Sequence, residues 1–133
     1  MIKDGIHVRF VITGKRNTFL KAFVYAFNGI VHFFMYDRNG RFHLGAALAA
    51  VLGGFALNIS NTEWLIILLC TGLVIAFEMI NAAIEKLCDV VHREFHPAIK
   101  IIKDMSAGAV LWVSIISLLV GTFIFFPKII ILL

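Results

Sequence analysis

The sequence predicts an all-α integral membrane protein, with an N-terminal amphipathic surface helix and three transmembrane helices in one domain over residues 1–133. Of the 133 residues, 61% are apolar and only 15% are charged. A soluble domain is about 45–50% apolar and about 25% charged. The apolar residues also gather in runs that can supply three spans of about 20 residues each. These proportions argue against a soluble globular domain.

The first predicted element is a surface helix over about residues 17–36. Its apolar side chains recur at helical spacing: Phe19, Leu20, Phe23, Phe27, Ile30 and Phe34. Lys15, Arg16 and Lys21 lie at its start. A basic amphipathic helix of this kind is typical of segments that lie along a membrane surface.

The first transmembrane helix is predicted over about residues 41–58. The run is rich in Ala and Gly, small residues that let membrane helices pack closely, and His43 is a polar interruption near its start. Because the run is short for a span, Arg41 is expected to reach the interface by snorkelling. The preceding segment, Asp37–Gly40, has the composition of a turn.

A short polar connection, Asn58–Glu63, precedes the second transmembrane helix, which is predicted over about residues 64–91 with a cytoplasmic extension. Three residues of the connection can cap the helix by accepting backbone N–H bonds: Ser60, Asn61 and Thr62. Glu63 is favourable in the first turn because its charge complements the helix dipole.

The third transmembrane helix is predicted over about residues 104–127. It is uncharged from Met105 to Phe126, and Pro127 is expected to end it. The polar stretch before it, His92–Asp104, contains Pro97, which suggests a turn or a new helix start.

The distribution of basic residues predicts the orientation in the membrane. Eleven of the twelve Lys and Arg residues lie before the first span or between Lys86 and Lys103. By the positive-inside rule, the N-terminus and the second loop face the cytoplasm and the C-terminus lies outside. We therefore expect a multi-pass protein of the cell inner (cytoplasmic) membrane. The net charge of +4 fits loops that face anionic lipid rather than nucleic acid.

One face of the second predicted span carries an unusual set of polar side chains. At 100° per residue, five of them lie within about 80° of one another: Glu78, Asn81, Glu85, Asp89 and His92. Carboxylates inside a membrane are costly and mark function by default, although pairing with Lys or Arg at the boundary is a purely structural alternative. Because carboxylates that share a face repel one another, either a proton is retained or a cation neutralises them.

Two chemistries suit this set of side chains. Carboxylate oxygens bind Mg²⁺ together with substrate phosphates, and a buried Glu can act as a general base. The second loop adds His96, Lys100, Lys103 and Asp104. Carboxylates, a metal and lysines beside a membrane favour phosphoryl transfer, which depends mostly on positioning and charge neutralisation. The chain has no GxxxxGK[ST], GxGxxG or protein-kinase motif, so an ATP site would differ from those of soluble kinases.

The central motif resembles that of a known family. Residues 78–85 read EMINAAIE and are followed by Asp89, which is similar to the ExxNxAIExxxD signature of the prokaryotic diacylglycerol kinase family, including undecaprenol kinases. Two further segments resemble the family: His96-Pro97 with Lys103–Val110, and Phe23–Ile30 upstream. The resemblance covers about residues 17–125.

The resemblance implies a homotrimeric membrane kinase, with active sites between subunits near the cytoplasmic face. Such an enzyme moves the γ-phosphate of MgATP to the primary hydroxyl of a lipid alcohol, with Mg²⁺ as cofactor. By position, the resemblance implies Glu78 as general base, Asn81 as a catalytic-site positioning group, and Glu85 with Asp37 as metal ligands. The implied ATP site comprises Tyr25, Asp37, Glu85, Glu94, His96, Lys103 and Asp104. Asp89 is implied in a supporting role, and Arg41 with Glu78 at the lipid substrate.

Asp37 departs from the family, which has a Glu at that position, one methylene longer. The connecting segment resembles the undecaprenol kinase branch at three places: Gly54-Phe55, Ile59-Ser60 and Thr62–Trp64. The sequence thus predicts an ATP-dependent lipid kinase that acts on undecaprenol or diacylglycerol.

Two other classes of protein compete with a kinase. A small proton- or cation-coupled transporter or channel subunit would also place Glu residues inside helices. Its acids would be expected near the midplane of a span, whereas here they cluster toward the cytoplasmic end. A membrane scaffold without catalysis is a third class, and it would tolerate loss of every acid on the polar face.

Overall fold

The computed structural model of the chain describes residues 18–132, and all regular structure in that range is helical. The four helices are α1 (Thr18–Tyr36), α2 (Arg38–Ala56), α3 (Asn61–Val91) and α4 (Pro97–Leu132). The predicted start of the first helix at Asn17 lies outside the described residues, as do Lys15 and Arg16.

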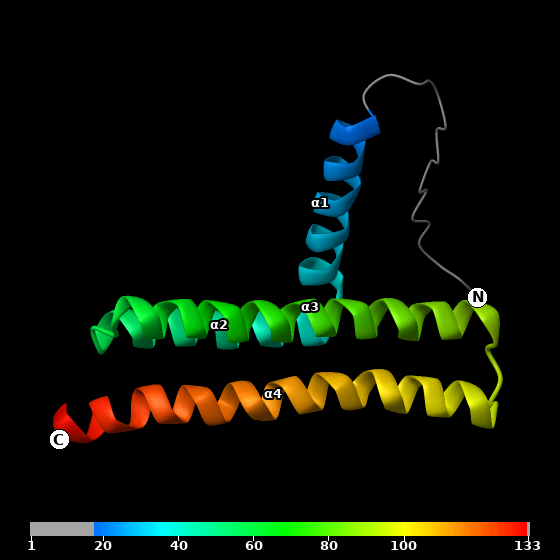
Figure 1. Cartoon of the computed structure of the whole chain (residues 1–133). Helices are drawn as coiled ribbons and strands as arrows, with labels where there is room; N and C mark the ends of the chain where they lie inside the picture. Colours follow the sequence, from blue (N-terminus) through cyan, green and yellow to red (C-terminus); the bar gives the residue numbers. More distant parts are fainter. Residues whose placement is uncertain (1–17, 133) are drawn as a thin grey trace.

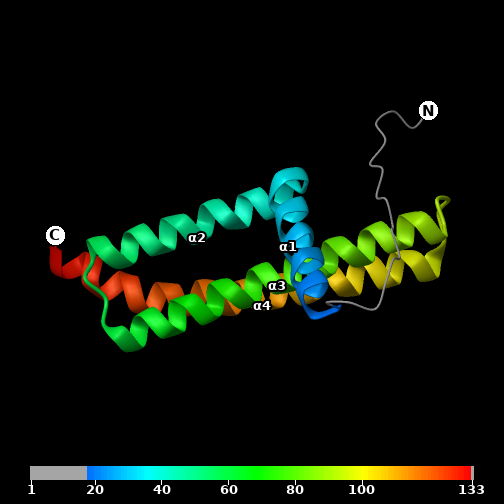
Figure 2. The same ribbon diagram turned by 90° about the horizontal axis from the view of Figure 1, so that it is seen from above.

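The axes of α2, α3 and α4 are aligned with one another, and α1 runs across them (Figure 1). The helices α3 and α4 lie side by side and antiparallel, and α2 accompanies the part nearer the α2–α3 turn (Figure 2). Both α3 and α4 continue past the corner where α1 meets α2. This arrangement separates a three-helix region from a two-helix extension.

Most large apolar side chains are exposed, which is the opposite of a water-soluble fold. Phe123 is 81% exposed and Trp112 is 70% exposed. The buried apolar residues are few: Phe33, Ile59, Ile67, Val74, Ala82, Cys88 and Ile124. An apolar surface this continuous needs lipid or other protein around it.

Length and composition select three helices as able to cross a membrane: α1 from Phe19, α3 and α4. This set differs from the predicted one, which has α2 in place of α1. The helix α2 is less apolar because its first turn carries Arg38, Asn39 and Arg41.

Side-chain caps determine where the helices begin. The Asp37 Oδ1 atom accepts hydrogen bonds from the backbone N–H groups of Asn39 (3.0 Å) and Gly40 (3.3 Å). Asp37 therefore caps α2, and the predicted turn at Asp37–Gly40 is the first turn of a helix.

The caps of the next two helices agree with the sequence. Ser60 and Glu63 form a reciprocal capping box at the start of α3, which confirms the predicted cap. The His96 Nδ1 atom accepts the Ala98 N–H at 3.2 Å, directly before α4 begins at Pro97. Pro97 is thus a helix start, as one of the two readings of its position predicted.

The prediction that Pro127 ends the last helix is wrong, because α4 continues through it to Leu132. Proline loses one backbone hydrogen bond, but membrane helices tolerate this when neighbouring groups adjust. The next residue, Lys128, has its Nζ atom 3.1 Å from Glu63 Oε2. This ion pair joins the end of α4 to the beginning of α3.

The close approach of α2 to the α2–α3 turn predicts a strong preference for glycine at position 54. A Cβ atom on Gly54 would lie 2.7 Å from Trp64 Cη2, whereas a Cβ atom on Gly53 would be an ordinary 3.7 Å from Phe125 Cε1. Overpacking costs about 1–3 kcal/mol, and alanine otherwise stabilises a helix by about 0.5–1 kcal/mol over glycine. We expect Gly54→Ala to lower the midpoint of thermal unfolding in detergent and Gly53→Ala to keep or raise it. Equal midpoints would contradict this packing.

Candidate active site

The polar face of α3 passes from the protein interior to solvent. Glu78 is 3% exposed and Asn81 is 4% exposed, and they are the only buried polar residues in the described range. Glu85, one turn further, is half-buried, and Asp89 is exposed. The helical period thus delivers a graded series of polar groups, with its buried end at Glu78.

Asn81 connects the two long helices. The Ser106 hydroxyl on α4 lies 2.6 Å from Asn81 Oδ1, and Asn81 Nδ2 donates to Glu85 Oε1 at 3.3 Å. Because both Asn81 bonds are made in a buried place, they fix the relative position of α3, α4 and the Glu85 carboxylate.

Glu78 has no hydrogen bond or ion pair to any other residue in the described part of the chain. Its carboxyl oxygens are not fully enclosed, since the Ser114 hydroxyl alone is an enclosed side-chain polar atom without a partner in the described residues. A carboxyl group on a largely apolar helix, with oxygen atoms still able to bond a ligand, is a candidate for function.

The corner between α1 and α2 meets the same part of α3. The Lys86 Nζ atom lies 4.0 Å from Asp37 Oδ2, and the other Asp37 oxygen caps α2. Since Lys86 directly follows Glu85, the contact brings Asp37 to the level of Glu85.

Beyond that level, the turn between α3 and α4 encloses a hollow of about 290 Å³. Four of the predicted ATP-site residues line it: Glu94, His96, Lys103 and Asp104. Lys103 pairs with Asp89 across the two helices, and Lys100 pairs with Asp104 along α4. The hollow therefore has basic groups held in place by acidic neighbours, which suits a charged ligand.

Two predicted site residues take part neither in the hollow nor in the polar contacts around Asn81 and Lys86. Tyr25 on α1 is 65% exposed, and Arg41 is exposed in the first turn of α2. No hydrogen bond or ion pair joins either side chain to another residue between 18 and 132. The structure thus brings together the predicted residues of α3 and α4 but not these two.

The donor set fits a divalent cation only together with substrate phosphates. No group of three His, Cys, Asp or Glu side chains gathers as a metal cluster in residues 18–132. However, Mg²⁺ is usually held by one or two carboxylates together with substrate phosphates. Glu85, with Oε1 bonded to Asn81 and Oε2 free of hydrogen bonds in this structure, fits that mode, and Asp37 contacts Lys86, the residue after Glu85.

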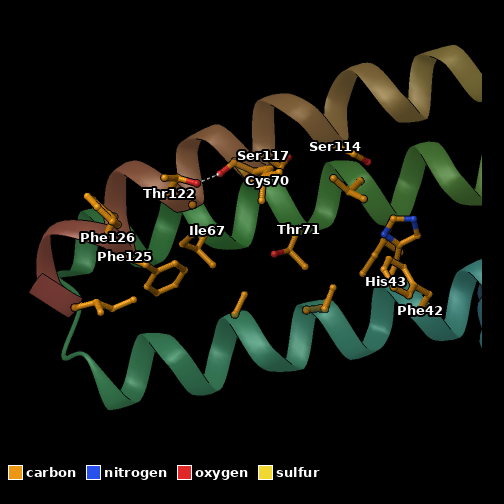
Figure 3. Close-up of a pocket in the computed structure, with 18 residues that line it drawn as sticks. Phe42, His43, Ile67, Cys70, Thr71, Ser114, Ser117, Thr122, Phe125 and Phe126 are labelled. Atoms are coloured by element: carbon orange, nitrogen blue, oxygen red, sulfur yellow. Dashed lines mark hydrogen bonds between the residues drawn. The ribbon is translucent and has the colours of Figure 1, made fainter.

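A second, larger cavity of about 690 Å³ lies between α2, α3 and α4 (Figure 3). Its lining is mostly apolar, with Phe42 and His43 at one end and Phe125 and Phe126 toward the other. Val74 of α3, one turn before Glu78, also lines it. The sequence did not predict this cavity.

Sequence reasoning also missed Ser106 and Lys86. Ser106 lies in an apparently apolar run, and its hydroxyl gains meaning only from the buried Asn81 that α4 packs against. Lys86 was read as a basic residue of the cytoplasmic side, and its contact with Asp37 depends on how the α1–α2 corner is placed.

Comparisons with known proteins agree on one family. The family model described as prokaryotic diacylglycerol kinase matches residues 24–125. The chain is 41% identical over 112 residues to an undecaprenol kinase of Bacillus subtilis, covering 84% of this chain and 91% of that protein. It is 32% identical over 109 residues to a diacylglycerol kinase of Synechocystis, covering 81% of this chain and 62% of that protein.

Two Asp37 variants separate its capping role from its charge. Asparagine caps a helix about as well as aspartate, whereas alanine costs about 1 kcal/mol. We expect Asp37→Asn to keep the unfolding midpoint and Asp37→Ala to lower it, while both weaken binding of Mn²⁺ in the presence of a non-hydrolysable ATP analogue. Calorimetry and the electron paramagnetic resonance signal of free Mn²⁺ measure the two effects. Unchanged Mn²⁺ binding in both variants would exclude Asp37 as a ligand.

Proposed function

The chain belongs to the prokaryotic diacylglycerol kinase family and is an ATP-dependent lipid kinase, and on that premise we propose that it phosphorylates undecaprenol at its primary hydroxyl. Diacylglycerol is the second candidate substrate. The higher identity and fuller coverage of the undecaprenol kinase favour the first. The comparisons give no support to a transporter or channel.

Glu78 carries this proposal. It is buried on α3 and has no partner among the described side chains, so its carboxylate is available to accept a proton from a hydroxyl group. We assign Glu78 as the general base, a role that contributes about 10²–10⁴-fold to rate. Asn81, one turn away and equally buried, holds Glu85 in position.

Glu85 and Asp37 are the proposed metal ligands, and the cofactor is Mg²⁺. When bound with ATP, Mg²⁺ neutralises charge on the phosphates. Glu85 Oε2 carries no hydrogen bond and Asp37 Oδ2 faces Lys86. Phosphate groups would compete with Asp37 for the Lys86 ammonium. This competition would leave Asp37 Oδ2 free to bind the cation.

The hollow between α3 and α4 is the proposed nucleotide site. Lys103 is the phosphate-binding group, with Asp89 as its support, and Glu94, His96 and Asp104 complete the lining. Tyr25 joins this set by resemblance, from α1. Lysine binds phosphate as a point charge. In the absence of phosphate, the ion pair with Asp89 keeps the Lys103 ammonium group at the lining of the hollow.

The apolar cavity between α2, α3 and α4 is the proposed site for the hydrocarbon chain of the lipid. From Ile67 beside Phe125, α3 runs along the cavity toward the end at Phe42 and His43, and its last lining residues lie one turn before Glu78 (Figure 3). A chain that lies there would bring its hydroxyl end toward Glu78, at the end of the cavity where Arg41 precedes Phe42 on α2. This supports an alcohol with a long apolar tail as the acceptor.

In the membrane, we propose that α1 lies on the cytoplasmic surface and that α2, α3 and α4 cross the bilayer. The support is the direction of α1 across the other helices, together with the basic residues of the cytoplasmic loops (Figure 1). We further propose the cell inner membrane, with the C-terminus outside. The exposed apolar faces leave room for the homotrimer that the resemblance implies.

Purified protein given labelled ATP with undecaprenol or diacylglycerol, in matched micelles, tests the proposal. We expect phosphate transfer to undecaprenol with the higher kcat/KM. Preference for diacylglycerol would reassign the substrate, and transfer to neither lipid would overturn the proposed function.

In the same assay, Glu78→Gln is expected to lower kcat by at least about 10²-fold, because glutamine fills the same space but cannot accept the proton. Binding of a non-hydrolysable MgATP analogue should remain. Near-normal turnover in this variant would remove Glu78 from the mechanism.

Filling the cavity tests the position of the lipid chain. Ala47 lines the cavity and Ala49, on the same helix, does not. We expect Ala47→Phe to raise the KM for the lipid about tenfold, the loss for removing roughly 1.4 kcal/mol of chain contact, while the KM for ATP stays constant. The matched control, Ala49→Phe, should leave both constants near those of the wild type. Equal effects of the two variants would place the chain elsewhere.

A further inference from the structure

We propose that Ser106 is a positioning residue for the metal-binding carboxylate of Glu85 and that it acts through Asn81. This inference rests on the proposed function, in which Glu85 binds Mg²⁺. Ser106 lies outside the motif on α3 and touches none of the reacting groups in the proposed mechanism. Its single polar contact with that motif is the 2.6 Å approach of its Oγ atom to Asn81 Oδ1.

The direction of each hydrogen bond follows from the chemistry of the groups. A carboxylate has only acceptors, so the side of the Asn81 amide that faces Glu85 must be the NH₂ group. The carbonyl side of the same amide then faces Ser106. A carbonyl oxygen only accepts, so the Ser106 hydroxyl must be the donor.

This assignment also decides between two possible acceptors for the Ser106 proton. The Lys103 backbone carbonyl lies 3.0 Å from Ser106 Oγ, within α4 itself, and could receive the proton instead. In that case Asn81 Oδ1 would lose its donor in a place that is 4% exposed. The shorter contact and the burial of Asn81 both favour donation to Asn81.

The result is a directed chain of two hydrogen bonds that ends on one oxygen of Glu85. The chain prevents the Asn81 amide from turning over, since a flipped amide would set its oxygen against the carboxylate. Glu85 Oε1 stays occupied and Oε2 is presented for a cation. Ser106 therefore fixes which oxygen of Glu85 is offered to the metal, from a different helix.

Loss of the Ser106 hydroxyl should weaken the metal site without removing any ligand. Partners that orient metal-binding groups typically contribute about 10–100-fold to metal affinity or activity. We expect Ser106→Ala to raise the dissociation constant for Mn²⁺, measured with β,γ-methylene ATP by electron paramagnetic resonance, about tenfold or more. The Mg²⁺ concentration for half-maximal kinase activity should rise by a similar factor.

Three further variants make the test specific. Ser106→Thr keeps the hydroxyl and should restore Mn²⁺ affinity. Ser106→Cys keeps the size but is a weak donor, so it should also weaken Mn²⁺ binding. It replaces Ser106→Ala in the test if the alanine variant does not fold. Ser114→Ala is the matched control for Mn²⁺ affinity alone, because Ser114 is on the same helix, its buried hydroxyl has no partner in the described structure, and it lines the apolar cavity and not the hollow.

The outcomes separate this inference from the proposed function. Weaker Mn²⁺ binding in Ser106→Ala and Ser106→Cys, with recovery in Ser106→Thr, supports it. Equal Mn²⁺ affinity in Ser106→Ala and Ser114→Ala overturns it, even where their unfolding midpoints differ. Failure of the proposed function appears instead as a wild-type protein that transfers no phosphate to either lipid.

Discussion

The antiparallel contact between α3 and α4 is the interaction on which the rest of the structure depends. Three polar ties join the helices along their length: Glu63 with Lys128 at one end, Asn81 with Ser106 in the middle, and Asp89 with Lys103 beyond it. In an apolar environment the hydrophobic effect does little to align two helices, so polar groups that must find partners set their register. The same register puts Ser106 beside Asn81 and shapes the hollow at the turn, so the site and the helix pair have a common cause.

Much of the fold follows from local rules that the sequence displays. Apolar runs predict the helices, and three polar residues, Ser60, Asn61 and Thr62, predict a cap before α3, of which the structure uses Ser60. Pro127 misled the prediction, since the rule that proline ends a helix is calibrated on helices in water. Hydropathy alone selects α1 together with α3 and α4, and it leaves out α2, which the sequence analysis predicted as a span.

In the site, too, contacts within one helix could be predicted from the sequence, whereas contacts between helices could not. The polar face of α3 could be predicted because helical geometry alone brings Glu78, Asn81 and Glu85 together. The partners from other helices could not, since Ser106 and Asp37 meet α3 only through the packing of α4 and the α1–α2 corner. The resemblance to a family supplied roles for several residues within its motifs, and it assigned none to Ser106, although Ser106 lies in the similar segment Lys103–Val110.

The lengths of α3 and α4 have a consequence for how the protein responds to its membrane. At 1.5 Å per residue, the 31 residues of α3 span about 46 Å and the 36 of α4 about 54 Å, against a hydrocarbon core of about 30 Å. In the proposed orientation, Glu78 and the nucleotide hollow therefore lie on the same two helices, α3 and α4, which extend beyond the bilayer. Because each of these helices is continuous, we expect a change in bilayer thickness to shift the depth of the lipid hydroxyl relative to Glu78. The rate of phosphate transfer would then depend on the thickness of the host membrane, and thus on its lipid composition.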